Sequence, residues 1–380
     1  MKILFVDDEP MVLSAMERAL FDTDWDIHCV TSGDEALAFL ADNEVDFVVS
    51  DMRMPGKDGA ELLEDVYNLY PDAVRIVLSG HADKDASSRA SLVAHQWLDK
   101  PCKPEVLRST LEKIDMARRM LPRKEVREIV GRTKALPSPP RTYARLREVL
   151  DEKTHDINDI AAIISEDPAL TAKVLQLVNS SFFLRMNSIS DVAEAVVRLG
   201  EELVSSVVLM TETYAKLPNV DGYSLADAQT HCVNVGRLAA RLVGPEAKQN
   251  TMLAGLLHDV GQSLLFLTFP EVTKAFMDRA RDSQDNDATI EIEQEIYGVD
   301  HAQVGAYLLH LWGFPYPLVE GVAFHHTPLK METSEFGPAA GIHVADRLLR
   351  KQPLDAEFVA RFSVADKLPR WEKMASDLTD

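Results

Sequence analysis

Polar residues interrupt a hydrophobic stretch late in the chain, where His258 and Asp259 stand side by side in "LLHDVGQSLL" (256–265). Seven of the eleven histidines fall between residues 231 and 343. His231 opens the amphipathic segment "HCVNVGRLAARLV", and His301 opens "HAQVGAYLLHLW". The candidate metal ligands on these segments are His231, His258, Asp259, His325, His326 and Asp346.

These side chains offer nitrogen and oxygen ligands, and we expect no thiolate among them. Such ligands suit a divalent ion such as Mn²⁺, Fe²⁺, Zn²⁺ or Mg²⁺. Successive residues of a helix point about 100° apart, so His258 and Asp259 can reach different sides of one cavity, or Asp259 can bridge two ions. Two ions about 3.5–4 Å apart form a clamp for phosphate esters. The alternative is that each histidine is a hydrogen-bonded core residue, as we expect for His310 and His343.

A second set of polar residues lies at the ends of apolar runs in the first 120 residues. Asp7 and Asp8 end the first run, Asp51 the third, Ser79 the fourth and Lys100 the fifth. Three carboxylates in one crevice repel each other, and Mg²⁺, which prefers oxygen ligands, relieves that repulsion. A neighbouring lysine and hydroxyl supply a positive charge and a donor for phosphoryl oxygens. The set predicts phosphoryl transfer to an aspartate, a known type of nucleophile.

Short β-rich runs separated by helical patterns must bring these residues together. The runs are "KILFVD" (2–7), "DIHCV" (26–30), "DFVVSD" (46–51), "RIVLSG" (75–80) and "HQWLDK" (95–100). Helical patterns occupy residues 9–22 and 33–43. Near-continuous apolar strands that alternate with helices indicate an α/β domain whose parallel sheet is covered on both faces. Ligands bind such sheets at the carboxyl ends of the strands.

This segment resembles the receiver domain of two-component response regulators over residues 1–118. The resemblance rests on "VDDEP" (6–10), "SDMRMPGKDG" (50–59), "LSG" (78–80) and "DKPCKP" (99–104). It implies a flavodoxin-like fold with a five-stranded parallel sheet, and phosphorylation of Asp51 by a sensor histidine kinase. It also implies the following roles: Asp8, Asp51 and the Arg53 carbonyl bind Mg²⁺ with help from Asp7, Ser79 and Lys100 hold the phosphoryl group, and Trp97 is the switch aromatic.

The switch position carries an indole, whereas members of that family usually have Tyr or Phe there. Phosphorylation adds a charge of about −1.5 to −2 at one point. Ser79 and Trp97 are the nearest groups that can carry this change to the last strand and helix of the receiver.

The helical pattern of residues 105–134 indicates that the last receiver helix continues beyond the domain. This segment is rich in Arg and Lys. We expect residues 119–134 to form a solvated helical linker; the alternatives are an electrostatic latch onto an acidic face and part of a dimer seam. The following "ALPSPP" (135–140) contains three prolines, cannot continue a helix and marks a domain boundary.

From residue 141 onward the strand pattern vanishes and helical spacing of apolar residues dominates. Examples are "DINDIAAIISED" (156–167), "PALTAKVLQLVNSS" (168–181) and "DVAEAVVRLGEELVSSVVLMTETYAKL" (191–217). These patterns predict an all-α domain of about 200 residues. The C-terminal residues 333–380 also have helical patterns, and we expect them to pack on the same bundle.

The order of the polar residues resembles the HD superfamily of metal-dependent phosphohydrolases, and residues 135–332 resemble an HDOD domain. The resemblance rests on "LPSPP", "IISEDPALTAKVLQLVNSSFF" (163–183), "AVVRLG" (195–200), "GLLHDVGQSLL" (255–265), "VDHAQVGAYLLHLWGFP" (299–315) and "HHTP" (325–328). HDOD domains are output domains of bacterial signalling proteins. The positions shared with the related cyclic di-GMP phosphodiesterases that carry an HD-GYP signature are His231, His258, Asp259, His301, His325, His326 and Asp346.

The sequence departs from those phosphodiesterases at two points. Gln262 follows "HDVG", where active relatives carry a lysine that neutralises substrate phosphate, and no Gly-Tyr-Pro motif follows "HH". A pocket without that lysine loses charge stabilisation of a transition state. The departures favour metal or nucleotide sensing, or a structural role, over fast hydrolysis.

Composition limits the class of protein. A chain of 380 residues predicts two or three domains, and contents of 46% apolar and 27% charged residues are typical of a soluble protein. The three scattered cysteines argue against a disulfide framework or a cysteine-based zinc site, and "MKILFVDDEP" is no signal peptide. We therefore expect a cytoplasmic protein without membrane contact. A net charge of −21 argues against direct DNA binding.

Together these patterns predict a response regulator in which phosphorylation of Asp51 controls an HDOD domain that acts through protein or ligand interaction. One alternative is a phosphorylation-gated, metal-dependent phosphodiesterase acting on a cyclic nucleotide. A further alternative is a sensor that binds such a nucleotide without cleaving it. A sensor histidine kinase is the expected upstream partner, the downstream partner is open, and so is homodimer formation.

Overall fold

We analysed a computed structural model that describes residues 1–79, 93–121, 123–133, 140–152, 154–178, 189–215, 217, 220–282 and 286–379. These residues form two compact units: residues 1–138 with 307–314, and residues 139–306 with 315–380. Within the described residues, no helix is both long and apolar enough to cross a membrane. The proline-rich boundary predicted at 135–140 lies outside the described residues except for Pro140.

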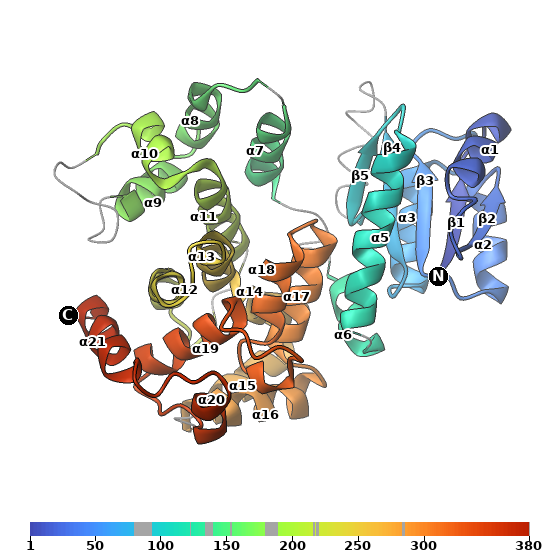
Figure 1. The fold of residues 1–380 in the computed structure, drawn as a ribbon. Coiled ribbons are helices and arrows are strands. Elements are labelled where there is room, and N and C mark those ends of the chain that lie inside the picture. Colours follow the sequence, from blue (N-terminus) through green and yellow to red (C-terminus); the bar gives the residue numbers. More distant parts are fainter. Residues whose placement is uncertain are drawn as a thin grey trace. The chain divides into compact units, whose positions relative to one another are not determined.

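The N-terminal unit contains a five-stranded parallel sheet in the order β2-β1-β3-β4-β5 (Figure 1). Its strands are β1 (Lys2–Val6), β2 (Asp26–Val30), β3 (Phe47–Asp51), β4 (Val74–Ser79) and β5 (Gln96–Asp99). This order places the carboxyl ends of β1 and β3 side by side, with Val6 in register with Ser50. The predicted α/β sheet is confirmed, and the residues that follow β1 and β3 must meet at one edge.

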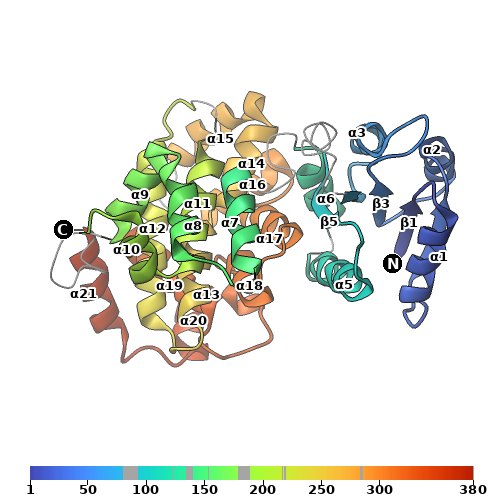
Figure 2. The ribbon, with the colours of Figure 1, turned by 90° about the horizontal axis from the view of Figure 1, so that it is seen from above.

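Helices cover both faces of this sheet. They are α1 (Pro10–Ala19), α2 (Gly33–Asp42), α3 (Gly59–Leu69) and α5 (Pro104–Met120). Figure 2 shows α2 and α3 on one face and α1 and α5 on the other. A capping box starts α3: the Asp58 side chain accepts from the backbone N–H of Glu61, whose carboxylate accepts from the backbone N–H of Asp58. The apolar residues of β1, β3 and β4 are almost fully buried, whereas those of β2 are partly exposed.

The segment after α5 packs on the sheet domain. It forms a separate helix, α6 (Lys124–Gly131), because the chain turns after Met120. A Cβ on Gly131 would lie 1.8 Å from the carbonyl oxygen of Pro71, so the two backbones are in direct contact. Arg127 pairs with Asp72 at 2.6 Å. Val126, Ile129 and Val130 of α6 are buried, so the expectation of a solvated linker is wrong for this helix. The electrostatic latch and the dimer seam stay predictions.

Arg75 on β4 joins helix α6 to the sheet. The side chain is 0% exposed, and burial lowers the pKa of its guanidinium to about 9. Its guanidinium donates to the carbonyl oxygens of Val93 (2.6 Å), Ala73 (3.1 Å) and Gly131 (2.9 Å). Since a buried carbonyl without a donor costs free energy, Arg75 stabilises β4, β5 and α6 together.

The second unit is helical in every described part, and its helix that begins at His301 continues into residues 307–311, which belong to the first unit. Its elements are α7 (Arg141–Asp151), α8 (Ile157–Ser165), α9 (Pro168–Val178), α10 (Val192–Leu199), α11 (Glu201–Tyr214), α12 (Leu225–Leu242), α13 (Lys248–Leu257), α14 (Val260–Thr268), α15 (Pro270–Asp282), α16 (Asn286–Tyr297), α17 (His301–Leu311), α18 (Tyr316–Ala323), a 3₁₀ turn (Pro328–Lys330), α19 (Pro338–Leu349), α20 (Ala356–Arg361) and α21 (Leu368–Thr379). The expected helical stretch 191–217 is broken at Gly200, whose φ of +86° suits glycine.

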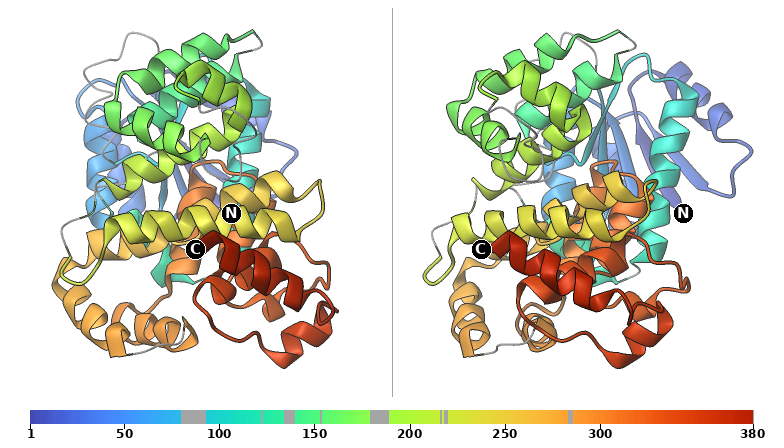
Figure 3. Two further views of the ribbon diagram at one scale, coloured as in Figure 1. Left: turned by 90° about the vertical axis from the view of Figure 1, so that its left-hand side faces the viewer. Right: turned by 60° about the vertical axis from the view of Figure 1, so that its left-hand side comes forward.

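The centre of this unit is built on close helix contacts. A Cβ on Gly255 of α13 would lie 2.5 Å from the Cα of Gly236 on α12, so these helices touch through their backbones. Gly341 brings α19 equally close to Val243, at the end of α12, where a Cβ would lie 2.9 Å from a valine methyl group. In Figure 3 the yellow helices α12 and α13 lie side by side, with the red α21 next to α12. The C-terminal helices thus belong to the same compact unit.

We predict that Arg75→Met lowers the free energy of unfolding of the sheet domain by about 2–4 kcal/mol, because several buried carbonyl oxygens lose their donor. Urea denaturation of the full chain, with hydrogen exchange of β4 and β5 amides as readout, measures this loss. The control is Arg108→Met, which removes an exposed ion pair with Asp22 and should cost far less than Arg75→Met, because solvent screens the pair. Equal losses in the two variants would contradict the role assigned to Arg75.

Candidate functional site

The sheet edge collects the carboxylates predicted for the receiver site. Oxygen atoms of Asp7, Asp8 and Asp51 lie within 4.8 Å of one another. Asp7 is 0% exposed and Asp51 8% exposed, whereas Asp8 is exposed. The Nζ atom of Lys100 lies 2.7 Å from Asp7 Oδ2 and 2.7 Å from Asp51 Oδ1. One lysine therefore neutralises part of a buried carboxylate cluster, and a hard cation fits beside it.

The protonation of this cluster follows from burial and pairing. Burial raises the pKa of the Asp51 carboxyl above its usual range, although Lys100 acts in the opposite direction. Burial lowers the pKa of Lys100, but its hydrogen bonds to Asp51 and Asp7 outweigh that effect and raise the pKa above the usual range. Lys100 thus remains a fixed positive charge beside the carboxylate that we expect to react.

The remaining predicted receiver residues lie around the same edge. Ser79 ends β4, and its carbonyl oxygen accepts from the backbone N–H of Lys100 at 2.8 Å. Arg53 lies two residues beyond Asp51 and is exposed. Trp97 on β5 is half-buried and packs against the apolar cluster between the sheet and α2 and α3. All the sequence-predicted positions of this site therefore lie on β1, β3, β4 and β5 or directly after them.

In the helical unit, a glycine brings the His-Asp pair next to a further histidine. His258 and Asp259 lie between α13 and α14. A Cβ on Gly261 would lie 2.0 Å from the carbonyl oxygen of His301 and 2.5 Å from the backbone nitrogen of Gly305. Only glycine allows α14 to approach the first turn of α17 this closely, so the "HDVG" motif sets the position of His301 relative to Asp259.

Three histidines form a hydrogen bond through Nδ1, which fixes the direction in which the opposite ring nitrogen, Nε2, points. The Nδ1–H groups of His258 and His325 donate to the carbonyl oxygens of Gly255 (2.8 Å) and Val322 (2.7 Å). The Nδ1–H of His301 donates to the carboxylate of Glu293 at 2.8 Å, and this glutamate is 0% exposed. A carbonyl or carboxylate oxygen can only accept, so an imidazole in its neutral form keeps its lone pair on Nε2. Burial lowers the pKa of His301, but Glu293 and Asp259 outweigh that effect and raise the pKa to about 10. Burial likewise lowers the pKa of His258, and Asp259 outweighs it and raises the pKa well above the usual range.

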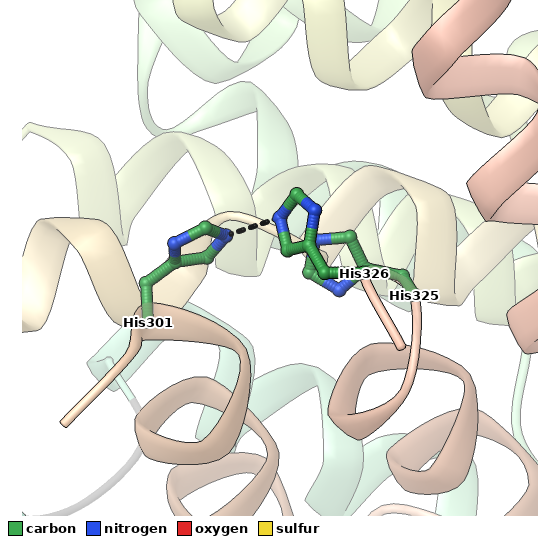
Figure 4. A group of neighbouring side chains, drawn as sticks. All are labelled: His301, His325 and His326. Atoms are coloured by element: carbon green, nitrogen blue, oxygen red, sulfur yellow. Dashed lines mark hydrogen bonds between the residues drawn. The ribbon is translucent and has the colours of Figure 1, made fainter. Parts of the chain in front are cut away.

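The Nε2 atoms converge in two groups that share a carboxylate. One group consists of His231, His258 and Asp346, the other of His301, His325 and His326, and the ligand atoms within each lie within 4.8 Å of one another. Asp259 lies between the groups: Oδ2 is 3.2 Å from His258 Nε2, and Oδ1 is 3.2 Å from His301 Nε2. Figure 4 shows the second group, in which the Nε2 atoms of His301 and His326 face each other at 3.1 Å.

The electrostatics of the second group favour neutral imidazoles at two positions. Burial, together with the charges of His258 and His301, lowers the pKa of His325 to about 3. Burial also lowers the pKa of His326 well below its usual range. His325 Nε2 is buried and has no hydrogen-bond partner among the described residues. A buried lone pair without a donor is the observation that fits a metal ligand best.

The pocket beside these groups has a volume of about 620 Å³. Its walls include His231, Asp259, His301 and His326. Gln262 also lines the pocket. The geometry can hold one or two divalent cations next to a cavity large enough for a small ligand.

Some residues of this site were not predicted from the sequence. Cys232 is 0% exposed, and its sulfur lies within 4.8 Å of ligand atoms of His258 and Asp259, so the expectation of no nearby thiol is wrong. Its place beside His231 on α12 was the available signal. Glu293 stands among alternating acids, and nothing in that pattern marks it as buried. Arg350 lies one helical turn after Asp346, a spacing that indicates an ion pair.

Comparison with known families identifies the two domains that carry these sites. A family model of the HDOD domain matches residues 136–328, and one of the response regulator receiver domain matches residues 3–112. The chain belongs to the HDOD family and carries an N-terminal response regulator receiver domain. Both predicted resemblances are thus confirmed. Receiver domains generally bind Mg²⁺, and HD-type domains bind metals.

Individual relatives match only parts of their own length. An uncharacterized protein of Treponema pallidum (strain Nichols) is 25% identical over 202 residues, 52% of this chain and 39% of that protein. The hydrogenase transcriptional regulatory protein HoxA of Cupriavidus necator is 36% identical over 113 residues, 29% of this chain and 23% of HoxA. A solved signal transduction protein of Marinobacter aquaeolei VT8 has a TM-score of 0.52 at 18% identity, covering 91% of this chain and 84% of that one. This last likeness supports the fold alone.

We predict that Gly261→Ala lowers the free energy of unfolding of the helical unit by at least about 1–3 kcal/mol, because the added methyl group has no room beside the His301 carbonyl. The same variant should bind Mn²⁺ more weakly, since α14 and α17 must separate. Thermal denaturation and Mn²⁺ titration measure the two effects. The matched control is Gly244→Ala, where a Cβ meets nothing within 4 Å; similar behaviour of both variants would refute the packing argument.

Proposed function

We propose that the protein is a response regulator that accepts a phosphoryl group on Asp51 from a sensor histidine kinase. The observation that carries this proposal is the position of Lys100, whose Nζ lies 2.7 Å from both Asp7 and Asp51. A phosphoryl group on Asp51 would place new oxygen acceptors beside this fixed positive charge. Asp7, Asp8, Asp51 and the carbonyl of Arg53 would hold Mg²⁺, which would neutralise charge on the transferred group.

The phosphoryl signal would leave the site through β4 and β5. The backbone N–H of Lys100 donates to the carbonyl oxygen of Ser79. A displacement of either residue would therefore be transmitted to the ends of both β4 and β5. Trp97 lies on β5, three residues before Lys100, and its half-buried indole packs against the apolar cluster of the sheet. Phosphorylation adds a charge of about −1.5 to −2, which draws Lys100 and the Ser79 hydroxyl toward Asp51.

We predict that radiolabelled acetyl phosphate labels the wild-type protein in the presence of Mg²⁺ and does not label Asp51→Asn. The amide cannot act as the nucleophile, while its size and burial stay nearly the same. The control is Asp24→Asn, an exposed acid of the same domain, which should label like the wild type. Persistent labelling of Asp51→Asn would overturn the assignment.

We also propose that the HDOD domain holds two divalent cations in the pocket. His231, His258 and Asp346 would bind one ion, and His301, His325 and His326 the other, with Asp259 between them. The buried Nε2 of His325 carries this proposal, because it has no hydrogen-bond partner among the described residues. Such a pair of ions supplies positive charge that polarises a phosphoryl oxygen.

We propose that the HDOD domain binds a phosphate-containing ligand in this pocket. Binding of the ligand would change the contacts of the domain with a downstream protein. Gln262 supports this proposal, because an amide offers hydrogen bonds but no positive charge to a transition state. Hydrolysis of a cyclic nucleotide is the second candidate function. It is favoured by Asp259, whose two oxygens reach toward both histidine groups as expected for a bridging carboxylate.

We predict that purified protein contains stoichiometric Mn, Fe or Zn, and that Asp259→Asn loses most of it because the site loses its shared negative charge. Elemental analysis measures the content. Asp227→Asn changes another acid that lines the same pocket and should retain the metal. A wild-type protein without metal would refute the metal site. Incubation of metal-loaded protein with cyclic di-GMP, with and without acetyl phosphate, separates the two functions: turnover supports the phosphodiesterase, and its absence supports binding.

A further inference from the structure

Arg350 occupies a place where its guanidinium faces the candidate metal ligands of α12 and α19. Its Nε donates to Asp346 Oδ1 at 2.8 Å. Its Nη2 lies 3.1 Å from His231 Nε2 and 3.9 Å from Asp259 Oδ2. A single side chain therefore contacts three of the four residues around the first ion position.

Burial explains why a cation is needed there. Asp346 is 2% exposed and Asp259 8% exposed, and both lie in a helical core. An ionised carboxylate at such a depth is costly unless a positive charge is near. His231 Nε2 lies 2.7 Å from Asp346 Oδ1, and the Nε2 atoms of His258 and His301 each lie 3.2 Å from Asp259. An imidazole supplies a positive charge only when it is protonated, whereas a guanidinium is always charged.

A simple ion pair along the surface of α19 does not explain this placement. A pair at spacing i, i+4 requires contact with Asp346 only, whereas Arg350 also reaches His231 on α12 and Asp259 before α14. Its side chain is 40% exposed and lines the 620 Å³ pocket, so the guanidinium can leave the carboxylates without crossing the core. Among the described residues that line this pocket, Arg350 is the only lysine or arginine.

We propose that Arg350 is an exchangeable counter-ion of the HDOD pocket: it neutralises Asp346 and Asp259 when no metal is bound, and a divalent cation displaces it. This inference rests on the metal site proposed above. Once displaced, the guanidinium stays on the pocket wall, where it binds the phosphate group of a ligand. Its planar fork suits two phosphate oxygens at once. Arg350 would then supply the positive charge that Gln262 does not.

The exchange predicts that removal of the Arg350 charge changes the affinities for Mn²⁺ and for phosphate in opposite directions. Arg350→Gln removes the competitor, so Mn²⁺ should bind on the order of tenfold more tightly than to the wild type. The same variant, loaded with Mn²⁺, should bind inorganic phosphate on the order of tenfold more weakly, because a charge-assisted hydrogen-bond donor is lost. Isothermal titration of the full chain with Mn²⁺ alone, and then with phosphate, measures both affinities.

Two further variants make the result interpretable. Arg347 lies on α19, one turn before Arg350, and its guanidinium donates to the carbonyl oxygen of Pro353. Arg347→Gln removes the same charge as Arg350→Gln and should leave the affinities for Mn²⁺ and for phosphate unchanged. Arg350→Lys keeps a positive charge with a shorter reach and without the fork, and it should give intermediate values for both ligands. It also serves if the glutamine variant fails to fold.

Each outcome decides between the interpretations. Tighter Mn²⁺ binding with weaker phosphate binding in Arg350→Gln supports the exchange. Equal Mn²⁺ affinity of the wild type and both Arg350 variants overturns the exchange and leaves the metal site intact. Absence of Mn²⁺ binding in all variants overturns the exchange and the metal site together. Unchanged phosphate affinity in Arg350→Gln overturns the role of Arg350 in anion binding.

Discussion

The cost of burying carboxylates is the constraint on which both domains depend. In the receiver, Asp7 and Asp51 are buried at the edge of the sheet, and Lys100 lies 2.7 Å from each. In the HDOD domain, Asp259 and Asp346 are buried among helices, with histidines and Arg350 beside them. In the receiver, one lysine faces three carboxylates. In the HDOD domain, the two carboxylates lie beside imidazole nitrogens that can bind a metal ion. Both sites therefore fit an added cation.

Close backbone contacts position these charged groups. Gly261 allows α14 to touch the first turn of α17, and this contact sets the distance between Asp259 and His301. In the receiver, Gly59 has the same function, because a Cβ there would lie 2.0 Å from the carbonyl oxygen of Asp51. Charged groups need tight supports of this kind, since an imidazole or carboxylate displaced by about 1 Å no longer fits a ligand geometry.

Several expectations from the sequence were confirmed, and the exceptions have physical reasons. Apolar strand patterns and helical spacing predicted the five-stranded sheet and the helical second unit, because burial selects apolar residues with the period of the element. The solvated linker was wrong, since helical periodicity says which face of a helix is apolar but not what covers it. Cys232 was not predicted, because a single cysteine on a helix has no spacing pattern that separates a site residue from a core residue.

The sequence by itself determined the order of the two domains and the identity of nearly all candidate ligands, because motifs such as "VDDEP" and "HDVG" combine residue type with local spacing. Only the tertiary structure decided how those ligands are grouped. Glu293, which orients His301, and Arg350, which reaches Asp259, contact residues on other helices. Such contacts depend on helix packing, and the distance between two side chains on different helices is not encoded in the local pattern of either one.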